Sequence, residues 1–368
     1  MQNHPHTPHT PTTDVLILGS GISGLIAGSI LMAHHRSVVL LEKARGPGGR
    51  LATRRTPLAS DPNRTATFDH GIQFLEFAQA QKTLEIPDQS GNPSPWEILQ
   101  PFLTQEQISS WTWTERAPHN LLSLRPLPAM NALPKTLPAA QHVQAQKKVI
   151  QLSYETNNTA SGPGTWIALS EDGSSSYARN LVSTIPVPQL LALLNQSHLP
   201  QASLGQTMAI KKLQSLAYHP CISLMIILSK TPHSPDSVTR HPSPEIDCIV
   251  NNTNKGISQH TPCVTIFASA SWSRAHFADS DEAVFKHLWS LCRSDTQAEP
   301  VEHQIHRWRY STPETHCPES FLELPLIEDR HAPPLLIGGD AFGRDDLTPF
   351  ERAILSGEAI ARHLQKAK

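Results

Sequence analysis

Residues 14–55 constrain the fold of this 368-residue chain more than any other stretch. A short apolar run is followed by Gly19, Gly21 and Gly24 in GxGxxG spacing. A helical stretch then leads to a second apolar run that ends at Glu42. A strand, a glycine turn, a helix and a second strand ending in an acid form the pattern of a dinucleotide-binding βαβ unit.

Each position in this pattern has a physical reason. Gly19 permits the tight turn, Gly21 lets a pyrophosphate approach the backbone, and Gly24 lets the helix pack on the strand. The free N–H groups of the first helical turn, which contains Ser23, attract phosphate. Glu42 suits the hydroxyl pair of an adenosine ribose. The alternative is a βαβ unit that binds no nucleotide, and at this point NAD and FAD are equally plausible ligands.

Composition excludes several other classes of protein. A net charge of −2 and a pI near 6.9 give no basic excess for nucleic acid or an anionic membrane surface. The five cysteines form no CxxC pair, so neither a disulfide framework nor a zinc site is predicted, and reduced thiols favour a cytoplasmic protein. Residues 1–13 are polar and read as a disordered tail, and no apolar run reaches the length of a membrane span.

The basic stretch after Glu42 extends the predicted nucleotide site. Lys43 follows the acid directly, and Gly49 can take backbone conformations closed to other residues. Arg50 can donate bidentate hydrogen bonds to phosphate. The alternative interpretation is a basic turn at the surface.

The sequences GPGGRLATRR (residues 46–55) and FDHGIQF (residues 68–74) resemble the flavoprotein amine-oxidase superfamily. Within it they are similar to renalase and its bacterial relatives, which are FAD-dependent oxidases of nicotinamide dinucleotides. This resemblance implies that Gly71 brings the backbone close to the isoalloxazine and that Gln73 offers an amide to its polar edge. Asp69 is expected to orient this loop.

The C-terminal segment resembles the second half of the flavin signature. A strand over residues 335–337 leads to Gly339 and Asp340, and a helix is expected to begin near Pro349. Asp340 can accept a hydrogen bond from a ribityl hydroxyl. The helix N-terminus can stabilise negative charge on the N1–C2 edge of a reduced flavin. A plain nicotinamide dehydrogenase would not need this segment, so FAD, held non-covalently, becomes the expected cofactor.

The middle of the chain has strand character. Alternating residues predict strands over 147–155, 165–170 and 180–184, which resemble the β-meander inserted in FAD-binding domains of this superfamily. By this resemblance Val149 contacts adenine through its backbone, and Thr184 ends a strand near the nucleotide.

Together these patterns predict an α/β fold with two domains. The first is a Rossmann-type FAD-binding domain with a parallel sheet and a β-meander. The second is an α+β substrate domain on a mostly antiparallel sheet, with strands over 222–228 and 264–269 and a helix over 281–292. The FAD-binding domain is assigned residues 14–77, 125–190 and 330–368, and the substrate domain residues 78–124 and 191–329.

The resemblance places three residues of the substrate domain in the flavin pocket as candidate catalytic residues: Tyr218, Asn252 and Trp308. Aromatic walls can hold a flat nicotinamide ring by stacking. The alternative for each residue is an ordinary place in the core or at the surface. Phe267 falls where the mammalian form carries histidine, so no histidine acid or base is expected there.

The leading functional hypothesis is a renalase-like oxidase of the 2- and 6-dihydro isomers of NAD(P)H. It would form NAD(P)+ and pass the electrons to molecular oxygen, giving hydrogen peroxide. Two alternatives stay open. One is another flavin oxidoreductase of the superfamily, acting on an amine or an unsaturated small molecule. The other is a non-catalytic FAD-binding protein.

Overall fold

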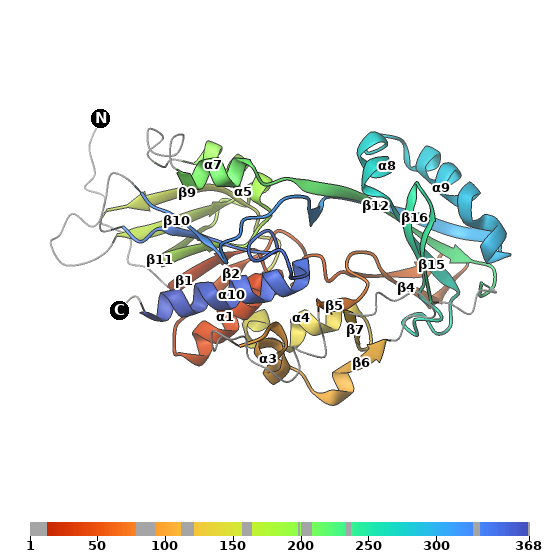
Figure 1. Cartoon of the computed structure of the whole chain (residues 1–368), viewed down its shortest axis with the longest axis horizontal. Coiled ribbons are helices and arrows are strands. Elements are labelled where there is room, and N and C mark those ends of the chain that lie inside the picture. Colours follow the sequence, from red (N-terminus) through yellow and green to blue (C-terminus); the bar gives the residue numbers. More distant parts are fainter. Residues whose placement is uncertain are drawn as a thin grey trace.

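The computed structural model describes residues 13–78, 93–111, 121–156, 164–197, 199, 208–232, 237–326 and 332–366 (Figure 1). The tail predicted over residues 1–13 lies outside these ranges, except for Thr13, which begins the first strand.

The larger sheet has the strand order β17-β18-β11-β1-β2-β8, and β9 and β10 continue from β11 as an antiparallel meander. Strands β11, β1, β2 and β8 pair in parallel. These strands and the helices beside them are β1 (Thr13–Leu18), α1 (Ile22–Ala33), β2 (Val38–Leu41), β8 (Val143–Gln144), β9 (Val149–Glu155), β10 (Thr165–Ser170), β11 (Ser175–Ser183), α5 (Val187–Gln196), α7 (Met208–Gln214), β17 (Leu322–Leu324), β18 (Leu335–Ile337) and α10 (Pro349–Lys366).

Strand β1 explains why this sheet is buried on both faces. Its side chains alternate, so Val15 and Ile17 join the core formed with α1 and α10, while Leu16 and Leu18 join the core formed with the meander, α5 and α7. A strand covered on both faces reads as a continuous apolar run, which is how it appears in the sequence. Figure 1 shows α1 and α10 side by side on one face of the sheet. The predicted Rossmann-type domain with its meander is confirmed.

The second sheet is antiparallel, with the order β13-β14-β15-β12-β16. One of its faces packs on α8 and α9 through Ile222, Leu224 and Ile226. The opposite face, which carries Ser223 and Met225, turns toward β4. The elements are β12 (Tyr218–Leu228), β13 (Val238–Ser243), β14 (Ile246–Asn251), β15 (Cys263–Ala268), α8 (Ala270–Ala275), α9 (Asp281–Thr296) and β16 (Pro300–Pro313). The predicted antiparallel sheet is therefore confirmed.

Two smaller sheets, β3-β4 and β5-β7-β6, complete the fold. Ile98 and Leu99 of α3 pack into the same core as α1 and α10, although residues 78–124 were predicted to belong to the substrate domain. The domain boundaries stay a prediction. The elements here are β3 (Thr53–Leu58), β4 (Asp61–Asp69), β5 (Leu75–Ala78), α3 (Pro95–Leu99), β6 (Ile108–Trp111), β7 (Leu121–Pro126), α4 (Leu133–Thr136) and the 3-10 helices η1 (Gln100–Phe102), η2 (Gln105–Gln107), η3 (Met130–Ala132) and η4 (Pro138–His142).

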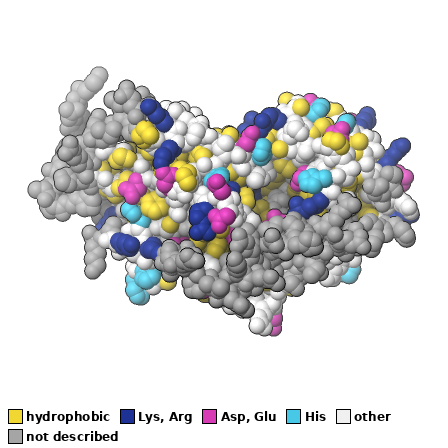
Figure 2. Space-filling view, viewed as in Figure 1, with side chains coloured by type: hydrophobic (Ala, Val, Ile, Leu, Met, Phe, Trp, Pro, Cys, Tyr) yellow, Lys and Arg dark blue, Asp and Glu magenta, His cyan; other side chains and the backbone are white. Residues whose placement is uncertain are grey.

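The surface is hollowed between the lobe that carries the meander and the lobe that carries α8 and α9 (Figure 2). In the part of the chain that the structure describes, no helix is both long enough and apolar enough to cross a membrane.

Candidate functional site

The glycine turn after β1 has the conformation that its sequence predicts. Gly19 has a φ of +95°, a value that disfavours residues with a side chain. Thr184 Oγ1 lies 3.1 Å from the carbonyl oxygen of Leu18 and 3.2 Å from that of Gly19, so its hydroxyl supports the turn. A Cβ on Gly24 would lie only 2.4 Å from the Gly19 carbonyl oxygen. Gly24 therefore has to be glycine for packing.

Gly21 lies against Gly49 and faces a gap on the side where a Cβ would point. A Cβ on Gly49 would lie 3.4 Å from the Cα of Gly21, whereas a Cβ on Gly21 would meet no heavy atom within 4 Å. The two glycine segments are joined where the Gly48 N–H donates to the Ser20 carbonyl oxygen at 2.9 Å. Helix α1 begins at this gap without a side-chain cap. Its first N–H groups are thus left for a ligand.

Ser23 provides a further donor at the start of α1. The side chain is buried, and its Oγ has no hydrogen-bond partner among the described residues. A buried hydroxyl without a partner is costly, because it has lost its hydrogen bonds to water. A phosphate oxygen at the start of α1 would satisfy it.

Glu42 is held at the carboxyl end of β2. Its Oε2 accepts hydrogen bonds from the backbone N–H and the Oγ of Ser20, at 3.0 and 2.8 Å, and its Oε1 accepts from the Ala44 N–H at 2.8 Å. An ionised carboxylate has about four acceptor positions, so it can still accept from a ribose hydroxyl. Lys43 is exposed and donates to Gln189 at 3.1 Å. Val149 begins β9 and is half-buried.

Arg50 and Asp340 bring the two halves of the chain together. The Arg50 guanidinium donates to Asp340 Oδ2 at 2.6 Å and to the Ser311 carbonyl oxygen at 2.7 Å. Burial acts to lower the pKa of Arg50, but the attraction of Asp340 raises it overall. Asp340 follows Gly339, whose φ of +136° favours glycine. Because Gly49 lies against Gly21, this cation is near the start of α1, where it could pair with a phosphate.

The Asp69 loop (residues 69–74) is hydrogen-bonded to the second sheet. The carbonyl oxygen of His70 accepts from Ser223 Oγ at 3.0 Å and from Trp308 Nε1 at 2.6 Å. On its other side the loop touches the Arg50 segment, because a Cβ on Gly71 would lie 2.1 Å from the Arg50 carbonyl oxygen. The loop is therefore fixed between the second sheet and the Arg50 segment.

His70, His306 and Trp308 form a cluster of rings beside this loop. The His70 ring stacks on Trp308 with centroids 5.6 Å apart, and His306 lies 5.0 Å from His70 and 4.3 Å from Trp308. Burial lowers the pKa of His70 and of His306 to about 4 each, and the charge of Arg54 adds to both shifts. Both imidazoles are therefore neutral at neutral pH.

The three predicted pocket residues lie in different surroundings in the structure. Trp308 lies in the ring cluster, and Tyr218 packs edge-to-face on Tyr310 at 5.9 Å, on the side of Asp340. Asn252 is fully buried, and its Nδ2 donates to Thr265 Oγ1 at 2.9 Å. Thr265 Oγ1 in turn donates to the Asp69 carbonyl oxygen at 3.2 Å, so Asn252 supports the Asp69 loop and does not line an open surface.

Gln73 also uses its side chain within the Asp69 loop. Its Nε2 lies 3.0 Å from the Asp69 carbonyl oxygen and 3.1 Å from that of Gly71. The amide therefore shapes the loop, whereas its contact to a flavin edge stays a prediction.

Three residues of the site were not singled out from the sequence: Arg54, Lys255 and His306. His306 and Trp308 alternate on β16, so a period of two in HRWRY could have revealed His306. Lys255 is buried against Asp69 with an Nζ to Oδ2 distance of 2.8 Å. No local pattern marks it, because it lies in a polar turn.

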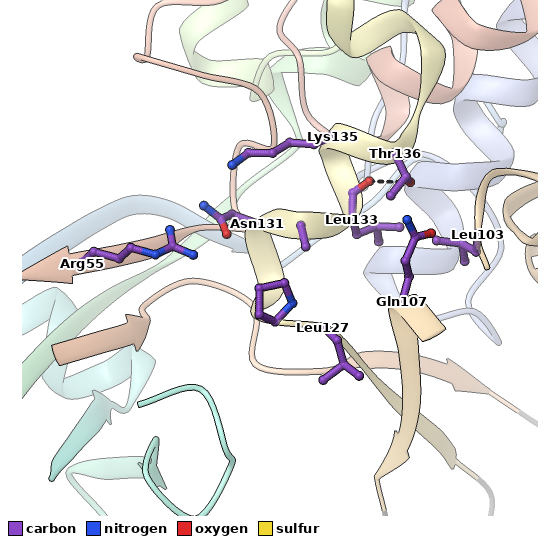
Figure 3. A pocket seen from close by; sticks show the side chains of 10 residues that line it. Arg55, Leu103, Gln107, Leu127, Asn131, Leu133, Lys135 and Thr136 are labelled. Atoms are coloured by element: carbon purple, nitrogen blue, oxygen red, sulfur yellow. Dashed lines mark hydrogen bonds between the residues drawn. The ribbon is translucent and has the colours of Figure 1, made fainter. Parts of the chain in front are cut away.

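A cavity of about 420 Å³ lies beside η3 and α4 (Figure 3). Arg55, Asn131 and Lys135 line it together with apolar residues that include Leu127 and Leu133. The Asn131 N–H donates to Thr53 Oγ1, which in turn donates to Asp69, so the wall of this cavity is connected to the Asp69 loop.

Comparison with known families defines the class of protein. The model for flavin containing amine oxidoreductases matches residues 122–365, more than half of the chain, and that for NAD(P)-binding Rossmann-like domains matches residues 17–85. The chain therefore belongs to the flavin containing amine oxidoreductase family. It is an oxidoreductase with FAD as its cofactor.

Solved structures show the same fold at low identity. A protoporphyrinogen oxidase candidate from Exiguobacterium is 13% identical, with a TM-score of 0.61 over 98% of this chain and 100% of that one. A putrescine oxidase redesigned in its cofactor binding and a reduced UDP-galactopyranose mutase are each 12% identical, both with a TM-score of 0.61. The match covers 97% of this chain in both cases, with 99% of the putrescine oxidase and 96% of the mutase.

Proposed function

We propose that the protein is a renalase-like oxidase that converts 2- and 6-dihydro isomers of NAD(P)H to NAD(P)+. When bound, FAD supplies a two-electron acceptor that takes a hydride from the substrate ring. The electrons then pass with protons to molecular oxygen, which becomes hydrogen peroxide.

The observation that carries this proposal is the charge around the ring cluster. Arg54 lowers the pKa of both imidazoles, whereas Asp69 acts in the opposite direction on His70. Asp69 is already paired with Lys255. The cluster therefore offers an uncharged and partly aromatic surface beside a cation. Among the residues that the structure describes, a cationic amine would find no unpaired carboxylate beside the cluster. An uncharged dihydropyridine ring on a dinucleotide with negative phosphates would be favoured.

The residues have separate roles in this proposal. Trp308 would hold the substrate ring by stacking, and the neutral imidazoles of His70 and His306 would hydrogen-bond its carboxamide. Tyr218 would close the side near Asp340. Asn252 would act through Thr265 on the Asp69 loop. No proton transfer is required from these side chains, because hydride transfer needs only the correct position of the donor carbon.

The residues proposed to hold FAD would bind it from the adenosine to the flavin ring. Glu42, Lys43 and Val149 would hold the adenosine half. The phosphates would lie between the two glycine segments and Arg50. The proposed cofactor residues are Gly19, Gly21, Ser23, Gly24, Glu42, Lys43, Gly49, Arg50, Gly71, Gln73, Val149, Thr184, Gly339 and Asp340.

The alternative of an amine oxidase would often show two aromatic rings that face each other before the flavin. Tyr218 and Tyr310 are neighbouring rings on this side of the second sheet, but their planes are 76° apart. This edge-to-face pair does not have the facing geometry of an amine cage.

The test is a peroxide assay of the FAD-loaded protein with a panel of substrates. We expect peroxide and NAD(P)+ in equal amounts from the dihydronicotinamide isomers, and none from putrescine or a monoamine. Peroxide from the amines alone would replace this proposal with the amine oxidase. Bound FAD with no peroxide from any donor would favour a non-catalytic FAD-binding protein.

A further inference from the structure

Lys255 is a buried cation for which the proposed reaction has no use. It lies in the turn after β14, and only 1% of its side chain is exposed. The turn is held by the Lys255 N–H, which donates to the Asn251 carbonyl oxygen at 2.8 Å, and by Gly256 at a φ of +81°. Burying an ammonium group is expensive unless its hydrogen bonds are satisfied. Burial lowers the pKa of this lysine, and Asp69 acts in the opposite direction.

The contacts of Lys255 join both ends of the Asp69 loop. Its Nζ donates to Asp69 Oδ2 at 2.8 Å and to the Gln73 carbonyl oxygen at 2.7 Å, with the Gln73 Oε1 at 3.3 Å. The same ammonium lies 4.8 Å from the centre of the Phe74 ring. One side chain from the second sheet therefore connects residues 69 and 73 of a loop in the nucleotide-binding half.

Asp69 extends this connection to two further segments. Its Oδ1 accepts from Thr53 Oγ1 at 2.5 Å and from the Met130 N–H at 3.2 Å. The carboxylate thus links β3, η3 and the turn that carries Lys255. Replacing a buried ion pair by apolar groups often leaves a protein equally stable. Stability alone therefore does not explain why a lysine is placed here.

We propose that Lys255 is a positioning residue, which holds the Asp69 loop in the one conformation that receives FAD and its substrate. It acts on the backbone of residues 69 and 73 and not on the reacting atoms. This inference rests on the proposed place of the flavin beside the Asp69 loop, but not on the identity of the substrate.

The test compares Lys255→Met with the double variant Asp69→Asn/Lys255→Met. The single variant leaves the Asp69 charge buried without its partner, so its melting temperature falls. In the double variant the asparagine can still accept from Thr53 and Met130, so we expect the melting temperature to return toward the parental value. Lys148→Met removes an exposed lysine that pairs with Glu171 and is the matched control, with no change expected.

The decisive readouts are the Kd for FAD and the visible spectrum of bound FAD, neither of which needs a substrate. For the double variant we expect a Kd for FAD raised on the order of tenfold. The Asp69 loop has then lost its hydrogen bonds to the charged Lys255, and FAD must order the loop when it binds. We also expect a shifted flavin spectrum, despite the recovered melting temperature. A double variant with parental stability, Kd and spectrum would overturn the proposal.

If the double variant does not fold, hydrogen exchange in the parental apo-protein tests the proposal instead. The proposal predicts slow exchange of the amides of residues 70–74 even without FAD, and fast exchange there would overturn it. Failure of the parent to oxidise dihydronicotinamides would contradict the proposed function and leave these results unchanged.

Discussion

The gap beside Gly21 gives the sharpest mutational prediction for the cofactor site. The change is Gly21→Ala. Gly21 has a φ of −67° and a ψ of 175°, which alanine also adopts, and its Cβ would meet no heavy atom within 4 Å. Alanine at an N-cap is less favourable than glycine by a few tenths of a kcal/mol or more. Alanine also restricts the unfolded chain, which stabilises the folded variant by about 0.4–1 kcal/mol and offsets this loss. The free energy of unfolding of the apo-protein should therefore change by less than about 0.5 kcal/mol.

The effect of Gly21→Ala on FAD should be much larger. The added methyl group enters the space proposed for the pyrophosphate, and overpacking of this kind costs about 1–3 kcal/mol. Because 1.4 kcal/mol is tenfold in affinity, the Kd for FAD should rise about 5- to 150-fold. Titration of FAD fluorescence with apo-protein measures the Kd, and denaturant unfolding measures the stability.

Two neighbouring glycines serve as controls. Gly46→Ala also has open space around its Cβ but lies outside the gap, so neither quantity should change. Gly24→Ala should unfold the protein more readily, since its Cβ lies 2.4 Å from the Gly19 carbonyl oxygen. A Gly21→Ala variant with parental stability and parental affinity for FAD would refute the assignment of the gap to the pyrophosphate.

Three further predictions concern the Asp69 loop. Gly71→Ala places a Cβ 2.1 Å from the Arg50 carbonyl oxygen, so it should lower the free energy of unfolding by about 1–3 kcal/mol or more, and unchanged denaturant unfolding would contradict this contact. Trp308→Phe removes the N–H that donates to the His70 carbonyl oxygen at 2.6 Å. FAD should stay bound, and flavin reduction measured by stopped flow should slow about five- to tenfold. A parental rate would exclude a role of Trp308 in placing the substrate. Burial lowers the pKa of His70 from 6.5 to about 4, so between these values the unfolded chain binds a proton that the folded chain does not. His70 should therefore contribute a fall in stability on the order of 3 kcal/mol as the pH drops from 6.5 to 4, and His70→Asn should lose less stability over the same range in denaturant titrations.

Much of the nucleotide-binding half could be predicted because its signals are local. The conformation of Gly19 is required by one tight turn, and parallel strands with both faces buried read as apolar runs. The predicted strand over residues 335–337 and the helix start at Pro349 match β18 and α10.

The groups around the Asp69 loop were harder to predict because they depend on distant contacts. Lys255 lies 186 positions from Asp69, and its sequence NNTNKG reads as a surface turn. Arg54 affects the two imidazoles only because β3 folds back beside β16. Asn252 was expected to face the pocket, yet it is buried behind the loop, since a polar residue in a turn does not reveal which partner it will meet.

The most direct test of the central claim is an anaerobic titration of the FAD-loaded protein with the 6-dihydro isomer of NAD. The proposed function predicts that one equivalent of this isomer removes the visible absorption band of oxidised flavin, and that the same amount of a cationic amine leaves the band unchanged. A flavin band that persists with the isomer but disappears with the amine would contradict the account.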